Sequence, residues 1–444
     1  MTSQNDKLLK LLELAKSQGA QAADGVLVEN TDINISQRMG KPEAIERSEN
    51  SSVGLRVFVG GSQASVSSSD MGAEALNEMV ERAVAMARLA PPDTDIQLAT
   101  ADIFPKIIPE LDLLDEAEPT PTWLLEQCKI AEDTARSVKG ITNSEGADAG
   151  YSRSRVCLAT SNGFVAGYDS SFFSVSASVL AGEGTSMERD YDFSSARHMA
   201  DLRDAEEIGL SAANRAIKRL NPRKVSSCSV PVVFDPRVSK SLLSILTGSI
   251  SGSSIARGAS FLKDEMGKAV FASGISIIDD PHILRGFASK PFDMEGVANK
   301  KTALVMDGVL QTWLLDIRTA NKLGLKTTGH ASRGISSPPS PSSSNSYMEA
   351  GKLSPKELMS DIKSGLYLTE TFGMGINTVT GDYSQGAAGF WIENGEIAYP
   401  VSEITIAGNL RDMFKNLHPA NDLSFRYSTN APTIRVENMT VAGT

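Results

Sequence analysis

Hydrophobic residues recur at helical spacing in the first stretch of the chain. One face of DKLLKLLELAKSQG carries its apolar residues, which are Leu8, Leu11, Leu12 and Ala15. Gly19 follows them, at the place where a glycine commonly ends a helix. The pattern predicts an amphipathic helix.

Apolar and polar residues then alternate in two stretches, residues 26–39 and 52–68. This period of two predicts antiparallel strands, and Gly60 with Gly61 marks a hairpin turn inside the second stretch. Residues 73–90 return to helical spacing, and the prolines that follow end that helix.

The same order of elements returns after a connector rich in proline and aspartate. Helical spacing covers residues 123–140 and 204–220, and strand-like stretches lie between them. A duplicated unit of helix, sheet and helix, with copies at 1–90 and 121–222, would explain this order. Two unrelated α+β modules of similar pattern are the alternative.

The composition changes near residue 229, toward hairpins and glycine and away from long helices. The pairs Asp307-Gly308 and Asn394-Gly395 each separate two alternating runs, as type I′ turns do. We therefore predict an α+β protein of two domains, an α+β domain at 1–222 and a mostly antiparallel β domain with helices at 223–444. The Ser- and Pro-rich residues 334–347 predict a mobile loop in the second domain.

Charge and cysteine content narrow the class of protein. A formal net charge of -11 disfavours a phosphate-binding surface, so we expect no direct binding of nucleic acid. Cys128, Cys157 and Cys228 form no CxxC pair, and an odd number argues against a disulfide framework. No apolar run approaches the ~18 residues of a membrane span, and the N-terminus lacks the apolar core of a signal peptide. We expect a cytoplasmic protein without membrane contact.

Metal-ligating residue types are scattered along the chain. The four histidines lie in four separate segments, so no helix offers two imidazoles to a metal; they are His198, His282, His330 and His418. The carboxylates of MERDYDF, namely Glu188, Asp190 and Asp192, flank Arg189 and predict an exposed, self-neutralising charge cluster.

Motifs for nucleophilic catalysis and phosphate binding are also missing. The sequence has no GxSxG elbow and no phosphate loop. Four residues are candidates for a peptide groove or an interface: Arg257 in SGSSIARG, His330 beside the Ser/Pro loop, and Asp382 and Tyr383 among the small residues of TGDYSQGAAG. The residues alone name no catalytic group and no metal ligand.

Residues 239–258, SKSLLSILTGSISGSSIARG, begin as an apolar helix and end in serine and glycine. Leu242, Ile245 and Leu246 recur at helical spacing, with Ile250 one turn further on. The stretch contains no His, Cys, Asp or Glu, although it turns small and polar where a site would carry its reactive groups.

Several stretches of the sequence resemble one known family. They are SGLYLTETFGMGINTVTGDYSQGAAGFWIENGEIAYPVSEITIAGNLRDM at 364–413, LRGFASKPFDMEGV at 284–297, WLLDIRTANKLGLKTTGHA at 313–331 and MERDYDF at 187–193. In them the chain is similar to the TldD/PmbA family of bacterial metallopeptidases, and within it to the PmbA (TldE) branch. The resemblance extends over nearly the whole chain.

In that family the TldD paralogue carries zinc on a helix with an HExxxH motif and takes a further ligand from a C-terminal cysteine. The corresponding helix here reads TGSISGSSIARG where those ligands would stand, and no cysteine follows Cys228. The counterpart of the missing cysteine lies near Ser428 to Asn430. The resemblance implies that this chain holds no metal and that a TldD-like partner holds the zinc.

The resemblance further implies a non-catalytic subunit of a heterodimeric zinc peptidase that acts on unfolded or extended peptides. A sheet edge in the C-terminal domain would suit capture of an extended peptide. Without its partner, the chain is expected to form a homodimer through the same surface. Two hypotheses stay open beside this one: a self-sufficient peptidase that uses dispersed residues such as His330, Asp382 and His418, and a non-proteolytic protein that binds DNA gyrase or a regulator.

Overall fold

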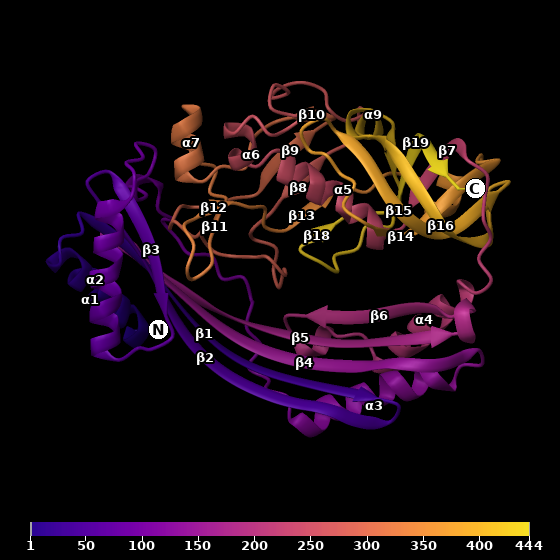
Figure 1. The fold of residues 1–444 in the computed structure, drawn as a ribbon, viewed down its shortest axis with the longest axis horizontal. Coiled ribbons are helices and arrows are strands. Elements are labelled where there is room, and N and C mark those ends of the chain that lie inside the picture. The colour runs from indigo at the N-terminus through magenta and orange to yellow at the C-terminus, as the bar shows by residue number, and fades with distance from the viewer. Residues whose placement is uncertain (1, 444) are drawn as a thin grey trace.

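A computed structural model describes residues 2–443, and it places a long curved sheet beneath a β-rich C-terminal domain (Figure 1). The sheet has six antiparallel strands in the order β3-β2-β1-β4-β5-β6. One of its faces packs on two pairs of helices, α1 with α2 and α3 with α4. The elements are α1 (Thr2–Ser17), β1 (Ala22–Arg38), β2 (Lys41–Val59), β3 (Ser62–Ser68), α2 (Ala73–Leu89), α3 (Pro121–Ser137), β4 (Ile141–Thr160), β5 (Val165–Ala181), β6 (Glu188–Ala196) and α4 (Ala205–Lys218).

Strand β5 shows why this sheet has one packed face and one open face. Val175 and Ala177 are buried against α3 and α4, whereas the alternate residues Ser174 and Ser176 are only half-buried. Side chains alternate between the two faces of a strand. The serines therefore lie on the face turned toward the C-terminal domain, on which Ala166 of the same strand packs with Phe292.

The order helix, three strands, helix occurs twice in the N-terminal part, and each copy supplies one half of the sheet. The first strands of the two copies, β1 and β4, pair at the centre over a long antiparallel register. The order agrees with the pattern found in the sequence. Descent of 1–90 and 121–222 from a duplication stays a prediction, as does the domain boundary at 222.

The C-terminal domain is mixed, with mostly antiparallel sheets and short helices, so the predicted α+β fold is confirmed. Both expected type I′ turns are present, since Asp307 and Asn394 adopt positive φ values of 46° and 51°. The elements are β7 (Cys228–Phe234), α5 (Pro236–Ser249), α6 (Gly252–Ala256), β8 (Ile277–Asp279), β9 (Thr302–Met306), β10 (Val309–Leu310), α7 (Ile317–Leu323), β11 (Ala331–Ser332), β12 (Ser340–Pro341), β13 (Ser346–Met348), α8 (Pro355–Met359), β14 (Ser364–Phe372), β15 (Asp382–Glu393), β16 (Glu396–Asn409), α9 (Leu410–Lys415), β17 (Leu417–Pro419), β18 (Thr429–Asn430) and β19 (Ile434–Ala442). None of the helices formed by residues 2–443 combines the length and the apolar character needed to cross a membrane.

The larger C-terminal sheet closes on itself. Its order is β16-β15-β14-β7-β19-β17, and β16 also pairs with β19, so five of the six strands form a ring. A closed sheet leaves few unpaired backbone groups for an added strand. The expected sheet edge for peptide capture is therefore not offered by this sheet in residues 2–443, apart from its three-residue strand β17.

The Ser- and Pro-rich residues 334–347 are not the fully mobile loop that their composition predicts. Ser344, Asn345 and Ser346 are buried, and β13 pairs with both β8 and β18. The Asp279 carboxylate accepts hydrogen bonds from the amide and the hydroxyl of Ser344, at 2.8 and 2.5 Å. These polar contacts take the place of the apolar burial that the composition lacks.

A buried ionic cluster joins the N-terminal sheet to the C-terminal domain. Asp24 on β1 accepts a hydrogen bond from Arg56 Nε on β2 at 2.9 Å and another from Arg333 of the C-terminal domain. All three side chains are at most 4% exposed. Burial alone would raise the pKa of Asp24, but the two guanidinium groups lower it below its usual value.

Glu295 of the C-terminal domain lies at the edge of this cluster, with its Oε1 4.0 Å from Nη1 of Arg56. Burial and the neighbouring Asp293 carboxylate raise the pKa of Glu295 to about 8. The two domains thus meet through charges whose balance depends on pH.

A close helix contact gives the first test of the fold. A Cβ added to Gly209 on α4 would lie 2.1 Å from the carbonyl oxygen of Ala131 on α3, whereas one added to Gly248 on α5 would contact nothing within 4 Å. Gly209→Ala should lower the free energy of unfolding by ~1 to 3 kcal/mol, because the helices must move apart. Gly248→Ala should raise it by up to about 1 kcal/mol, the helix-propensity difference. Chemical denaturation measures both, and equal effects would contradict this packing.

The pH dependence of stability tests the environment of Glu295. A carboxyl whose pKa is raised in the folded state loses stability as pH rises from its unfolded pKa to its folded pKa, here from about 4.5 to about 8. Glu295→Gln should therefore gain stability relative to the unmodified chain between pH 5 and pH 8. The exposed Glu46→Gln is the control. Thermal melts that show the same difference at both pH values for Glu295→Gln would refute the assigned environment.

Candidate functional site

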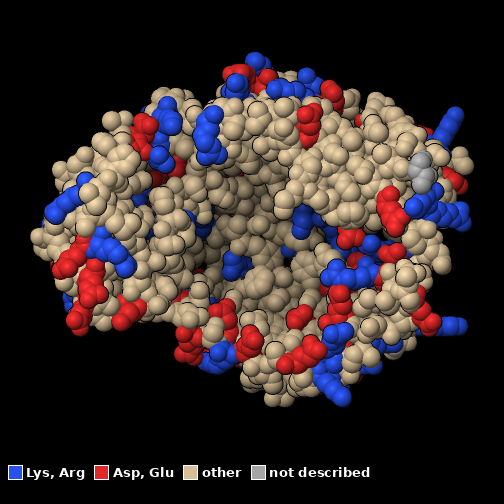
Figure 2. All heavy atoms as spheres, viewed as in Figure 1, with Lys and Arg blue, Asp and Glu red and all other residues tan. Residues whose placement is uncertain are grey.

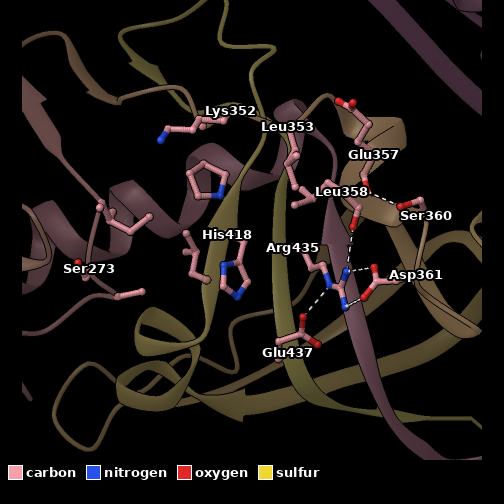
Figure 3. Close-up of a pocket in the computed structure, with 16 residues that line it drawn as sticks. Ser273, Lys352, Leu353, Glu357, Leu358, Ser360, Asp361, His418, Arg435 and Glu437 are labelled. Carbon is pink, nitrogen blue, oxygen red and sulfur yellow. Dashed lines mark hydrogen bonds and ion pairs between the residues drawn. The ribbon is translucent and has the colours of Figure 1, made fainter.

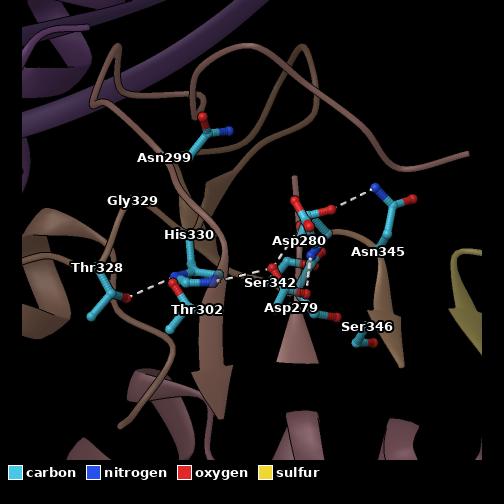
Figure 4. Close-up of polar contacts among 12 residues, drawn as sticks. Asp279, Asp280, Asn299, Thr302, Thr328, Gly329, His330, Ser342, Asn345 and Ser346 are labelled. Atoms are coloured by element: carbon cyan, nitrogen blue, oxygen red, sulfur yellow. Dashed lines mark hydrogen bonds and ion pairs between the residues drawn. The ribbon is translucent and has the colours of Figure 1, made fainter. Parts of the chain in front are cut away.

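The four candidate residues from the sequence lie in different surroundings. His330 is buried, with Nε2 3.3 Å from Oδ2 of Asp279 and Nδ1 2.9 Å from the Thr328 hydroxyl (Figure 4). Tyr383 is 2% exposed in the C-terminal core, where burial raises its pKa. Asp382 is exposed and accepts a hydrogen bond from the Thr380 hydroxyl. Arg257 is exposed at the end of α6. No hydrogen bond or ion pair between residues 2–443 joins these four side chains, so they form no common site.

His418 lines a separate open hollow of about 810 Å³ on the C-terminal domain (Figure 3). The guanidinium group of Arg435 there is paired with Asp361 at 2.6 Å and with Glu437 at 2.6 Å. Lys352 points away from these charges. The charges of this hollow are largely satisfied by one another, and this favours a structural role.

A longer trough lies along the interface between the N-terminal sheet and the C-terminal domain, which we call the seam. Three adjoining hollows of about 750, 270 and 500 Å³ share lining residues and run along β6, α5 and residues 426–431. The space-filling view shows the hollowed centre of the molecule, with basic side chains on its floor and rim (Figure 2). We take this trough as the candidate functional site and call its 500 Å³ part the aromatic hollow.

Helix α5 forms one wall of the aromatic hollow. Asp235 caps its first turn by accepting from the Arg237 amide, and Pro236 occupies its first position. Leu242 and Leu246 are buried in the domain core, as their spacing predicts, which turns Lys240, Ser241 and Ser244 toward the hollow. The helix ends at Ser249, and the short α6 follows after Ile250 and Ser251, where the sequence turns to serine and glycine.

The turn at residues 426–430 forms the adjoining wall. Asn430 holds it, because its side-chain oxygen accepts from the amides of Arg426 and Tyr427 and its NH2 donates to the Tyr427 carbonyl. The Ser239 hydroxyl on α5 donates to the Pro432 carbonyl at 2.8 Å and ties this segment to the helix. The structure thus brings together α5 and residues 428–430, two segments far apart in sequence.

Aromatic rings line the aromatic hollow, together with two cations, Lys240 and Arg426, that form no ion pair within residues 2–443. Nζ of Lys240 lies 3.1 Å from the centroid of the Tyr427 ring. The ring centroids of Phe193 and Tyr427 are 5.7 Å apart. Burial and the nearby Arg237 lower the pKa of Lys240 to about 8. The remaining lining residues are Phe172, Ser195, Ser241, Ser244, Phe287, Ser428 and Thr429.

Strand β6 forms the opposite wall, and it corrects an expectation from the sequence. The predicted exposed cluster at 187–193 is wrong, because Asp190 and Asp192 are only 6% and 5% exposed. Arg237 on α5 reaches Asp190 at 2.9 Å across the seam, and Arg203 reaches Asp192 at 3.1 Å. The alternation of side chains in MERDYDF is typical of a strand. The many charged residues favoured an exposed cluster instead, so the strand was not predicted.

The walls of the aromatic hollow do not fit a zinc ion. Zinc is held by Cys, His, Asp or Glu side chains, and the aromatic hollow is lined instead by hydroxyl groups, aromatic rings and two cations. A lysine ammonium beside the helix would also repel a divalent cation. Within residues 2–443, no three His, Cys, Asp or Glu side chains lie close enough to hold a metal ion. His330, Asp382 and His418 thus form no shared metal site.

Sequence reasoning missed the residues that line the trough. Lys240 and Tyr427 are 187 positions apart, and neither belongs to a catalytic motif. The alternation in FFSVSASVL indicated an open polar face of β5, and it is the nearest signal that could have pointed to this seam.

Comparison with known proteins identifies the family. Three family models match, described as PmbA/TldA metallopeptidase domain 1 at residues 23–87, the central domain at 114–220 and the C-terminal domain at 227–443. The Metalloprotease PmbA of Escherichia coli O157:H7 is 39% identical over 437 residues, which are 97% of this chain and 94% of that protein. A PmbA homolog of Haemophilus influenzae is 36% identical over 97% of this chain and 94% of its own length.

Solved structures share the fold over the full length. A protein of Bacteroides thetaiotaomicron, described as a candidate modulator of DNA gyrase, has a TM-score of 0.92 at 27% identity, with both chains covered completely. TldE of Thermococcus kodakarensis has a TM-score of 0.87 at 22% identity, with 98% of this chain and 100% of that chain covered, and shows the fold alone. The sequence relatives and the matched domains together show that this chain belongs to the PmbA/TldD family of metallopeptidases.

Proposed function

We propose that the chain is a non-catalytic subunit of a peptidase complex whose zinc site belongs to a TldD-like paralogue. One observation carries the proposal. The family resemblance implies metal ligands at 247–258 and near 428–430, and neither stretch holds a His, Cys, Asp or Glu. Helix α5, which leads into the first stretch, meets residues 428–430 at the trough and presents Lys240 and Ser244 there. Such side chains leave the backbone framework of a site without its metal chemistry.

The substrates that we propose for the complex are unfolded or extended peptides. The trough supports this class of ligand because it is long, open at the surface and lined by both aromatic and polar groups. Pockets of this kind accept main-chain and side-chain groups together. Because the larger C-terminal sheet is closed, recognition by side chains in the trough is favoured over addition of a strand to that sheet.

We further propose that the chain pairs with its paralogue through a surface that it uses for a homodimer when it is alone. Paralogous chains of one fold present similar surfaces, and the same patch then serves symmetric and pseudosymmetric pairs. Membership of this chain in the PmbA/TldD family supports the choice of a TldD-like paralogue as partner.

Metal content tests the first part of the proposal. The purified chain, equilibrated with zinc and then desalted, should contain far less than one zinc per chain, because the trough offers no ligand set. Elemental analysis measures this, with a TldD-like paralogue purified in parallel as the positive control. One tightly held zinc per chain, together with peptidase activity that a chelator abolishes, would refute the proposal and favour a self-sufficient peptidase.

Reconstitution tests the second part. The chain alone should not cleave an unfolded peptide, and a zinc-loaded TldD-like paralogue should cleave it faster when this chain is added in equal amount. Light scattering should show a dimer for the chain alone and a one-to-one complex after mixing. A paralogue whose activity is unchanged by the chain, combined with capture of DNA gyrase by the chain, would instead support the regulator-binding hypothesis.

A further inference from the structure

Positive charge without a counter-charge is concentrated at the aromatic hollow, in a chain whose net charge is -11. Lys240 and Arg426 line it, and no carboxylate does. No ion pair within residues 2–443 involves either side chain. Arg197, which donates to the Phe287 carbonyl behind the hollow, has no carboxylate partner in that range either, and its buried Nε has no acceptor.

The carboxylates that line the adjoining parts of the trough are already bound by other groups. Asp235 accepts from the Arg237 amide and the Tyr367 hydroxyl, and Asp422 accepts from the amide and the hydroxyl of Thr433. Asp190 is shared by Arg237 and Arg219, and Asp192 accepts from Arg203. These acids also accept hydrogen bonds from the amides of the residues that follow them on β6, at 2.8 and 2.9 Å. They are therefore not free to neutralise Lys240, and an anion from outside can do so.

The rings around Lys240 add an apolar part to the same site. Phe172, Phe193 and Phe287 line the hollow, and Tyr427 lies under the lysine ammonium. The volume of about 500 Å³ suits one or two residues of a peptide. The lowered pKa of Lys240 agrees with a cation that burial and Arg237 leave without a counter-charge.

We propose that the aromatic hollow binds the C-terminal carboxylate of a peptide, with the ammonium of Lys240 and the guanidinium of Arg426 as its charge partners and the phenylalanine rings around the last side chain. The inference rests on the proposed function in that it takes a peptide as the ligand. It adds that the free end of the chain is recognised and that an apolar last residue is preferred.

Calorimetric titration of the full chain with defined peptides tests the site. The probe is an acetylated tetra-alanine peptide ending in phenylalanine, compared with its C-terminal amide and with a free acid ending in glycine. The acid ending in phenylalanine should bind about tenfold or more tightly than the amide, because a charge-assisted contact is lost in the amide. It should also bind more tightly than the peptide ending in glycine. Equal affinities of acid and amide would overturn the proposal.

Two variants test whether Lys240 and Arg426 cause the preference for the free acid. Lys240→Met keeps the length of the side chain and should remove most of the preference for the free acid, and the exposed Arg426→Gln should reduce it with no effect on folding. The exposed Lys263→Met is the matched control and should keep the full preference. Retention of the preference in both site variants would overturn the assignment of these residues.

The peptide-binding test and the test of the subunit role can fail independently of each other. Binding is measured with this chain alone, without zinc and without a paralogue. A chain that prefers the free acid but leaves a TldD-like paralogue inactive would support this site and refute the subunit role. Stimulation of the paralogue without any preference for the free acid would do the reverse.

Discussion

The buried contact between Asp24, Arg56 and Arg333 joins the N-terminal sheet to the C-terminal domain. It holds the N-terminal sheet against the C-terminal domain at one end of the seam. Asp24 and Arg56 belong to β1 and β2, and Arg333 belongs to the C-terminal domain. Removal of one partner would leave an uncompensated buried charge, which is far more costly than a lost surface pair. At the other end of the seam, Arg237 on α5 and Arg219 just after α4 both reach Asp190 on β6. The trough lies along this seam, and Asp190 and Arg237 of the second contact line it.

The backbone of the trough walls is fixed by contacts that do not involve the side chains facing the trough. The apolar face of α5 is fixed by core packing of Leu242 and Leu246, and it would hold the helix in place whatever its outer residues were. The turn at 426–430 is likewise fixed by the side chain of Asn430 and not by a ligand. The outer positions are therefore free to change, and in this chain they carry a lysine and hydroxyl groups that suit an anion better than a metal ion.

Much of the fold could be predicted from the sequence because local patterns determine it. Periodicity found the helices of the N-terminal part, and the glycine turns after Asp307 and Asn394 found two hairpins. Strand β6 was missed because the charges of Asp190 and Asp192 are satisfied by arginines distant in sequence, which no local pattern reveals. The packed part of 334–347 was missed for the same kind of reason, since Asp279 supplies its buried hydrogen bonds. The candidate site was missed because Lys240 and Tyr427 meet only in the folded chain.

By the proposal made above, the wall formed by α5 and residues 426–430 recognises an anionic group and not a metal ion. A crystal structure of the chain grown with both zinc and the peptide ending in phenylalanine, with data recorded above the zinc absorption edge, tests it most directly. The peptide carboxylate should lie at the Lys240 ammonium, with the last ring of the peptide against Phe193, and no anomalous peak should appear beside α5. An anomalous peak between α5 and Ser428, or a peptide bound elsewhere with the trough empty, would contradict it.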